Sequence, residues 1–220
     1  MINNFKLGIK MFRYGTGLVG MMVCCGIFLA LALIYNSLGT GGSFGDFFLM
    51  MVPIYPVQII YTISISSFIA SSPVKKRMQT SVPATICCFN MIAIYLVNAL
   101  CKGIMLAGHP ENIGAACAEL LSLAGFGVIF MLYIGLAYKY FAVSIVMGII
   151  VYFYTINRLN GVNTAWPHIF ENSAGSFALA LLIGLVCIVI GGFGQYGLAL
   201  LVYKVPISKY ALSAVVRKEM

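Results

Sequence analysis

The chain has 220 residues, of which 62% are hydrophobic and only 8% are charged, and its mean hydropathy is +1.02. The 13 basic and 5 acidic residues are too few to cover the surface of a soluble domain of this size. The same composition excludes a disordered chain, because disordered segments are poor in apolar residues and rich in charge. We therefore predict an all-α integral membrane protein.

The first segment, residues 1–16, has the pattern of an amphipathic helix. Apolar residues recur at spacings of three and four, and basic residues form a separate stripe. Such a helix lies in the cytoplasmic interface with its cations near anionic head groups. It serves either as a topology anchor or as a lever that contacts a cytoplasmic partner. The apolar stripe comprises Ile2, Phe5, Ile9 and Phe12, and the basic stripe comprises Lys6, Lys10 and Arg13.

Six membrane spans follow from the lengths of the apolar runs and the charges between them. A crossing helix needs about 20 apolar residues, and charged residues mark its ends because each costs about 2.5–3.5 kcal/mol at mid-bilayer. By this rule Lys102 ends the third span, and Glu119 lies at the outer edge of the fourth. The fifth span is the shortest. The predicted spans are approximately 17–35, 47–70, 82–101, 120–138, 140–156 and 176–203.

The loop charges set the predicted topology. With six spans and a cytoplasmic N-terminus, all of the 13 basic residues except Lys102 and Arg158 lie on the cytoplasmic side. The net charge of +8 then reflects topology, and we expect no nucleic-acid partner. We predict a single transmembrane domain, residues 1–220, that crosses the plasma membrane of a bacterial cell and has both termini in the cytoplasm.

The connection between the second and third spans is predicted to be a short basic helix over residues 73–80. Ser72 suits the N-cap and Pro73 the first helical position. Pro83 favours an extended residue before it and would therefore end this helix ahead of the third span. The charge rule explains three cations in a cytoplasmic loop, but it does not require a capped helix. The segment comprises Ser72, Pro73, Val74, Lys75, Lys76, Arg77, Met78 and Gln79.

A polar line runs along the second span, with tyrosines beside it. Pro53 and Pro56 precede the line and are expected to kink the helix. Such a face either lines a transport pathway or hydrogen-bonds a neighbouring helix. The outer segment 157–175 is long for a tight loop, and whether it re-enters the membrane is left open. The polar line comprises Tyr55, Gln58, Tyr61, Thr62 and Ser66.

Motifs for catalysis and cofactor binding are missing from the sequence. It contains no P-loop, no H-E-x-x-H and no G-x-S-x-G. Two matches to G-x-G-x-x-G, at 15–20 and 192–197, follow no strand and are interpreted as small residues that let helices approach closely. The seven cysteines are interpreted as apolar filler, with a disulfide between Cys101 and Cys117 as an open alternative. We expect no enzymatic activity, cofactor or metal on this chain.

Together, these features resemble the type-2 ATP-binding-cassette (ABC) permease family. The resemblance rests on the amphipathic N-terminal helix, the six spans and the stretch from Ser71 to Thr80, SSPVKKRMQT. It implies that residues 73–80 are a coupling helix that docks on a cytosolic ATPase, and that the segment with Lys6, Lys10 and Arg13 is the neighbouring connecting helix. It further implies a pair of permease subunits, ATP and Mg on the partner ATPase, and export of an amphipathic or apolar peptide or drug by alternating access.

Two other functions are compatible with the same composition. The substrate-capture subunit of an energy-coupling-factor importer is also a six-span chain of about this size, and it would bind a small vitamin or metal. An intramembrane enzyme would need carboxylates or histidines inside the spans, whereas Glu119, Glu171, His109 and His168 are predicted to lie at or beyond the outer boundary. The substrate, the pathway residues and the choice between homodimer and heterodimer are not readable from the sequence.

Overall fold

The computed structural model describes residues 2–13, 18–37, 45, 48–49, 51–66, 69, 71–137 and 174–205. Over these residues all regular secondary structure is helical, which confirms the all-α prediction. The helices are α1 (Ile2–Phe12), α2 (Leu18–Ser37), α4 (Ile54–Ile65), α6 (Lys75–Gln79), α7 (Ser81–Gly108), the short 3₁₀ helix η1 (Pro110–Asn112), α8 (Ile113–Ala137) and α10 (Ala174–Val202).

Among the described residues, four helical segments are long and apolar enough to cross a membrane, namely Leu18–Tyr35, Lys75–Gly108, Pro110–Leu136 and Ser176–Val202. They coincide with the first, third, fourth and sixth predicted spans, so the chain is compatible with a membrane protein. The second predicted span is described only in part, and α4 within it has 12 residues. The fifth span, 140–156, and nearly all of 157–175 lie outside the described residues. Six spans therefore remain a prediction.

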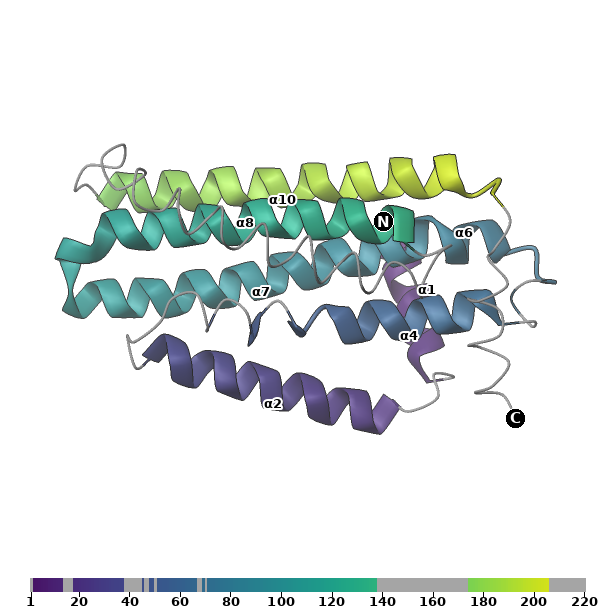
Figure 1. Ribbon diagram of the computed structural model, residues 1–220, viewed down its shortest axis with the longest axis horizontal. Helices are drawn as coiled ribbons and strands as arrows, with labels where there is room; N and C mark the ends of the chain where they lie inside the picture. The colour runs from purple at the N-terminus through teal and green to yellow at the C-terminus, as the bar shows by residue number, and fades with distance from the viewer. Residues whose placement is uncertain are drawn as a thin grey trace.

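The long helices lie lengthwise beside one another (Figure 1). α7 and α8 form a hairpin through His109 and η1, and α10 packs along α8. In this view α2 lies at the opposite edge from α10 (Figure 1). At one end of the bundle α1 crosses α4 and α7, close to α6.

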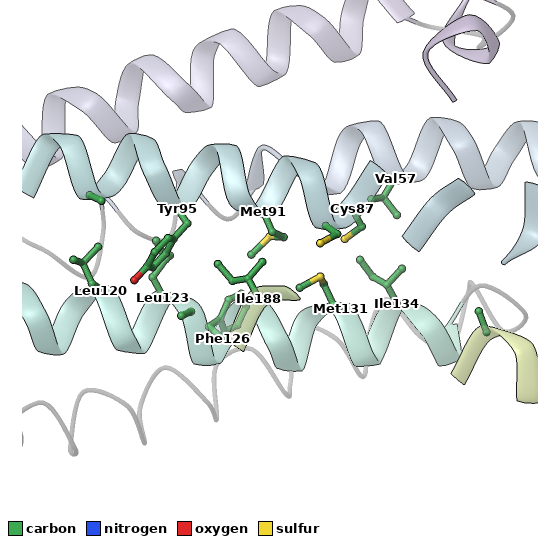
Figure 2. Packing of buried hydrophobic residues seen from close by; sticks show 14 of the residues in the cluster. Val57, Cys87, Met91, Tyr95, Leu120, Leu123, Phe126, Met131, Ile134 and Ile188 are labelled. Carbon is green, nitrogen blue, oxygen red and sulfur yellow. The ribbon is translucent and has the colours of Figure 1, made fainter. Parts of the chain in front are cut away.

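The main core lies between α7, α8 and α10 (Figure 2). Sulfur-containing side chains fill part of it, because Cys87, Met91 and Met131 are fully buried within it, as the interpretation of cysteine as apolar filler predicts. Tyr95 crosses from α7 to α10, where its hydroxyl donates to the Ala180 carbonyl at 3.1 Å. The ring fits there because Gly184 has no side chain to meet the tyrosine hydroxyl.

Two glycines of the 192–197 motif lie where α10 meets its neighbours. A Cβ at Gly192 would lie 2.9 Å from Cys88 Sγ, and a Cβ at Gly194 would lie 2.7 Å from Leu132 Cδ2. Gly197 faces open space. The interpretation of this motif as close helix packing is therefore confirmed for its first two glycines.

The prediction that Lys102 ends the third apolar helix is wrong. α7 continues to Gly108, and α8 begins at Ile113, six residues before Glu119. Both charges therefore lie within helices, where the Lys102 ammonium pairs with the Glu119 carboxylate and their side chains are 4% and 26% exposed. Pairing across the hairpin neutralises the two charges, so that neither forces the chain out of its helix.

The expected kink in the second span occurs at the first of its two prolines. Val52 and Pro53 form a turn, and α4 begins directly after them at Ile54. Pro56 lies in the first turn of α4 without breaking it, because its missing N–H has no partner within the helix there. α4 ends at Ile65, and the C-cap residue Ser66 is extended, with a ψ of 150°.

Candidate functional site

The segments singled out in the sequence meet at one end of the bundle, where α1, α4, α6 and the start of α7 share a second hydrophobic cluster. α1 and α6 are therefore held by a common core and are not separate appendages. The buried members of the cluster are Ile59, Ile60, Ile63, Ile69, Met78, Val82 and Ile86, against which Phe5, Leu7, Met11, Phe12, Leu18, Met21 and Val74 pack.

α6 begins later than the sequence predicts. Residues 71–74 form a turn in which the Ser72 hydroxyl accepts a hydrogen bond from the Val74 N–H at 3.3 Å, and the Lys75 N–H donates to the Ser72 carbonyl at 3.1 Å. The N-cap is Val74, without a side-chain cap. The prediction of Ser72 as N-cap and Pro73 as first helical residue is therefore wrong. Serine hydroxyls also stabilise such turns, and in this chain that competing structure forms.

Thr80, and not the residue before Pro83, separates α6 from α7. Thr80 has φ −125° and ψ −73°, whereas Ser81 already starts α7. Pro83 is buried in the first turn of α7, where a proline costs no helical hydrogen bond. The predicted break before the third apolar helix therefore exists, but it lies at Thr80, two residues before Val82, and the predicted extended conformation of Val82 is wrong.

The two sides of α6 have opposite environments. Met78 and Gln79 are buried, and the Gln79 amide nitrogen donates to the Ser64 carbonyl at the end of α4, at 3.1 Å. Lys76 and Arg77 are exposed. The predicted docking segment thus divides into residues that hold it to the protein and residues that another molecule can reach.

α1 packs on α7 through a close contact at Gly8. A Cβ there would lie 2.6 Å from Ile86 Cδ1 and 3.3 Å from Val82 Cγ1, so a larger residue would require the buried Ile86 side chain to move. One turn away, the ring of Phe5 lies 4.7 Å from that of Phe89, measured between centroids.

The packed face of α1 differs from the predicted apolar stripe. Phe5 and Phe12 of that stripe pack in the cluster, whereas Ile9 is 49% exposed and the side chain of Ile2 lies outside the described part of the chain. Leu7 and Met11 pack in their place, beside Phe5 and Phe12. The contact centres on Gly8, which an apolar count over the sequence overlooks.

A polar contact joins α1 to α6. The Arg77 guanidinium donates to the Asn4 side-chain oxygen at 2.6 Å, on the exposed side of the unit. The sequence pattern did not predict a role for Asn4 or Gly8, because each contacts residues that are more than 70 positions away in the sequence.

In the described part of the chain, this end of the bundle carries positive charge and no carboxylate. Among the described residues, the ion pairs are Lys102–Glu119 and His109–Glu111, which both lie around the α7–α8 hairpin. The first 45 residues of the sequence contain no Asp or Glu, and neither does the stretch from 71 to 81. The described cations at the α6 end are Lys6, Lys10, Arg13, Lys75, Lys76, Arg77 and Lys204.

The polar line of the second span bonds largely within its own helix. The Thr62 hydroxyl donates to the Gln58 carbonyl at 2.8 Å, and the Ser66 hydroxyl donates to the Ile63 carbonyl at 2.6 Å. The Tyr61 hydroxyl reaches another helix, where it donates to the Ile134 carbonyl of α8 at 3.4 Å, and the Tyr55 side chain hydrogen-bonds Cys24 of α2. The half-buried Tyr55 stacks on Phe28 of α2, with ring centroids 6.0 Å apart.

The described cysteines are free thiols, including Cys101 and Cys117, so no disulfide joins the hairpin in this structure. Among the described residues no group of three or more His, Cys, Asp or Glu side chains is arranged to hold a metal. His168 and Glu171 lie outside the described part of the chain.

Comparison of the chain with protein-family models finds no match, and comparisons with curated proteins and with solved structures find none either. Any functional proposal therefore depends on the residues and their arrangement.

Proposed function

We propose that this chain is the membrane-spanning subunit of an ATP-driven exporter of the type-2 ABC permease kind, and that α6 is the helix through which a cytosolic ATPase acts on it. The observation that carries the proposal is the division of α6 into an anchored side and an exposed cationic side. A helix that transmits force must be fixed to the part it moves and must also offer a surface to the part that drives it.

The anchored side of α6 connects it to several helices at once. Met78 is fully buried in the cluster shared by α1, α4 and α7, and the Gln79 amide is bonded to α4. A displacement of α6 therefore displaces the start of α7 and the end of α4 with it, since packed interiors resist deformation. Both helices lead into the predicted membrane domain.

The exposed side fits a partner with acidic groups. Lys76 and Arg77 are exposed, and no carboxylate of the described residues pairs with them. Charges of this kind steer association and fix the register of an interface more than they add to affinity. The chain also lacks a P-loop, so that active transport would need ATP and Mg bound to a partner.

The proposed assembly is a pair of permease subunits with two ATPase subunits, in a plasma membrane whose cytoplasmic side faces the α6 end. The positive-inside rule supports this orientation because the described cations other than Lys102 gather at that end. The proposed cargo is an amphipathic or apolar molecule, such as a peptide or drug, because the spans are rich in aromatic side chains and poor in charge.

The test is recovery of an ATPase subunit with the full-length chain purified in mild detergent from its native membrane. K76E/R77E reverses the exposed charges of α6 and is expected to reduce the recovered ATPase at least ten-fold, since like charges across an interface cost several kcal/mol. The matched control, K6E/K10E, makes the same change in net charge on α1 and is expected to retain the ATPase.

Full retention of the ATPase by K76E/R77E would remove α6 from the interface. Purification of a transport-active chain without any ATPase would refute the exporter proposal as a whole. Membrane insertion of both variants is checked by extraction with alkaline carbonate, so that loss of the partner is not confused with loss of the protein.

A further inference from the structure

The outward face of α1 is cationic and is separate from the exposed side of α6. At 100° per residue, Lys6, Lys10 and Arg13 fall within about 60° of the helix circumference. Gly8, at the centre of the packed face, lies nearly opposite Lys10 on the same wheel. All three cations are exposed. We propose that this face is a binding site for the head groups of anionic phospholipids.

The depth at which α1 meets α7 favours a lipid partner. α1 packs against Val82, Ile86 and Phe89, which lie between about 2 and 12 Å from the start of α7 along its axis. α1 crosses α4 and α7 and does not extend the bundle lengthwise (Figure 1). α1 therefore lies across the flank of the bundle near the start of the predicted third span, and its cations are exposed there.

An apolar side chain beside the cationic face supports the same partner. Ile9 is 49% exposed and lies next to this sector on the helix wheel. A helix that lies in the interface combines basic residues that reach phosphates with apolar residues that enter the boundary of the acyl chains. A cytosolic protein would bury the Ile9 side chain only if it covered α1 on its lateral face, where lipid is expected to lie.

The charge of this face needs a counter-ion from outside the described chain. No ion pair in the described structure involves Lys6, Lys10 or Arg13, and the nearest acidic residue in the sequence is Asp46. Lipid phosphates supply negative charge at this depth, and each basic residue close to an anionic membrane surface raises the binding constant about five-fold. This inference depends on membrane insertion and does not depend on the proposed ATPase partner.

The test compares phosphatidylglycerol with phosphatidylcholine, both as fluorescent analogues, binding to the detergent-purified full-length chain. The wild type is expected to prefer phosphatidylglycerol. In K6Q/K10Q/R13Q this preference is expected to fall by about five-fold for each cation removed. The control K75Q/K76Q/K204Q loses the same charge at the same end of the bundle but leaves α1 and the Arg77–Asn4 contact intact, and it is expected to keep the preference within two-fold.

An unchanged lipid preference in the α1 variant overturns the proposal, because it shows that the three α1 cations do not bind the head group. An equal loss of preference in both variants also overturns it, because it shows that the preference depends only on the net charge of this end. Loss of a cytosolic protein partner from the α1 variant, with lipid preference retained, would assign this face to that partner and would also overturn it. The single variants K6Q and K10Q, each expected to lose about five-fold, keep the test available if the triple variant fails to fold.

Discussion

The buried ion pair between Lys102 and Glu119 predicts an asymmetric response to removal of each partner. Removing one member of a buried pair leaves the other uncompensated and typically costs about 3–5 kcal/mol. Here the two members are not buried equally, since the Lys102 side chain is 4% exposed and that of Glu119 is 26% exposed. E119L strands the deeper charge and should cost about 3–5 kcal/mol, whereas K102M strands the more exposed carboxylate and should cost about 1–2 kcal/mol.

The double variant K102M/E119L completes the cycle. With both charges gone, the apolar replacements fill similar volumes, and the free energy of unfolding should return to within about 1 kcal/mol of the wild type. The measurement is unfolding by titration with SDS of the protein in mixed micelles, followed by circular dichroism. A K102M variant at least as unstable as E119L, or a double variant whose loss equals the sum of the single losses, would show that the pair does not act as described.

Three further predictions concern the packing of the helices. G8V should detach α1 from α7 at a cost of about 1–3 kcal/mol, because no space exists beside Ile86, and hydrogen exchange over residues 2–12 should then rise. M78A should lower the free energy of unfolding by about 2–5 kcal/mol and should loosen α6 before the long helices, as limited proteolysis at residues 75–79 would reveal. Y95F removes one hydrogen bond to α10 without altering the packed ring and should cost about 0.5–1.5 kcal/mol in the same SDS titration.

The sequence was sufficient to predict five of the described helices from a helical period or a long apolar run. The spacing over residues 1–16 predicted α1, and the apolar runs predicted α2, α7, α8 and α10. The predicted bounds of α2 and α10 agree with the structure to within a few residues. Local signals set these elements, because helix formation depends on residues within a turn or two. α6 also lies in the predicted segment, although the turn chemistry of Ser72 shortened it.

Pairwise contacts between distant residues were not predictable from the sequence. We predicted that Lys102 and Glu119 lie at helix ends, because an isolated charge is costly in a membrane. In the structure the two side chains pair, although they are 17 positions apart in the sequence, so both can lie within helices. The face of α1 that packs was set by the approach of Gly8 to Ile86, which the apolar pattern of α1 does not contain. Hydroxyls that the sequence suggested for a pathway or a neighbouring helix bond to the carbonyls of α4 itself, as the short reach of Thr and Ser favours.

The gathering of seven described cations at one end has an electrical consequence. A living cell keeps its interior negative, and carrying one elementary charge across such a membrane takes about 2.3 kcal/mol for every 100 mV. Inversion of the protein would require the whole basic end to move through the hydrocarbon core of the bilayer and against the membrane potential. In the proposed orientation, with the α6 end in the cytoplasm, the membrane potential would therefore oppose inversion of the protein, and it would do so more strongly as the potential increases.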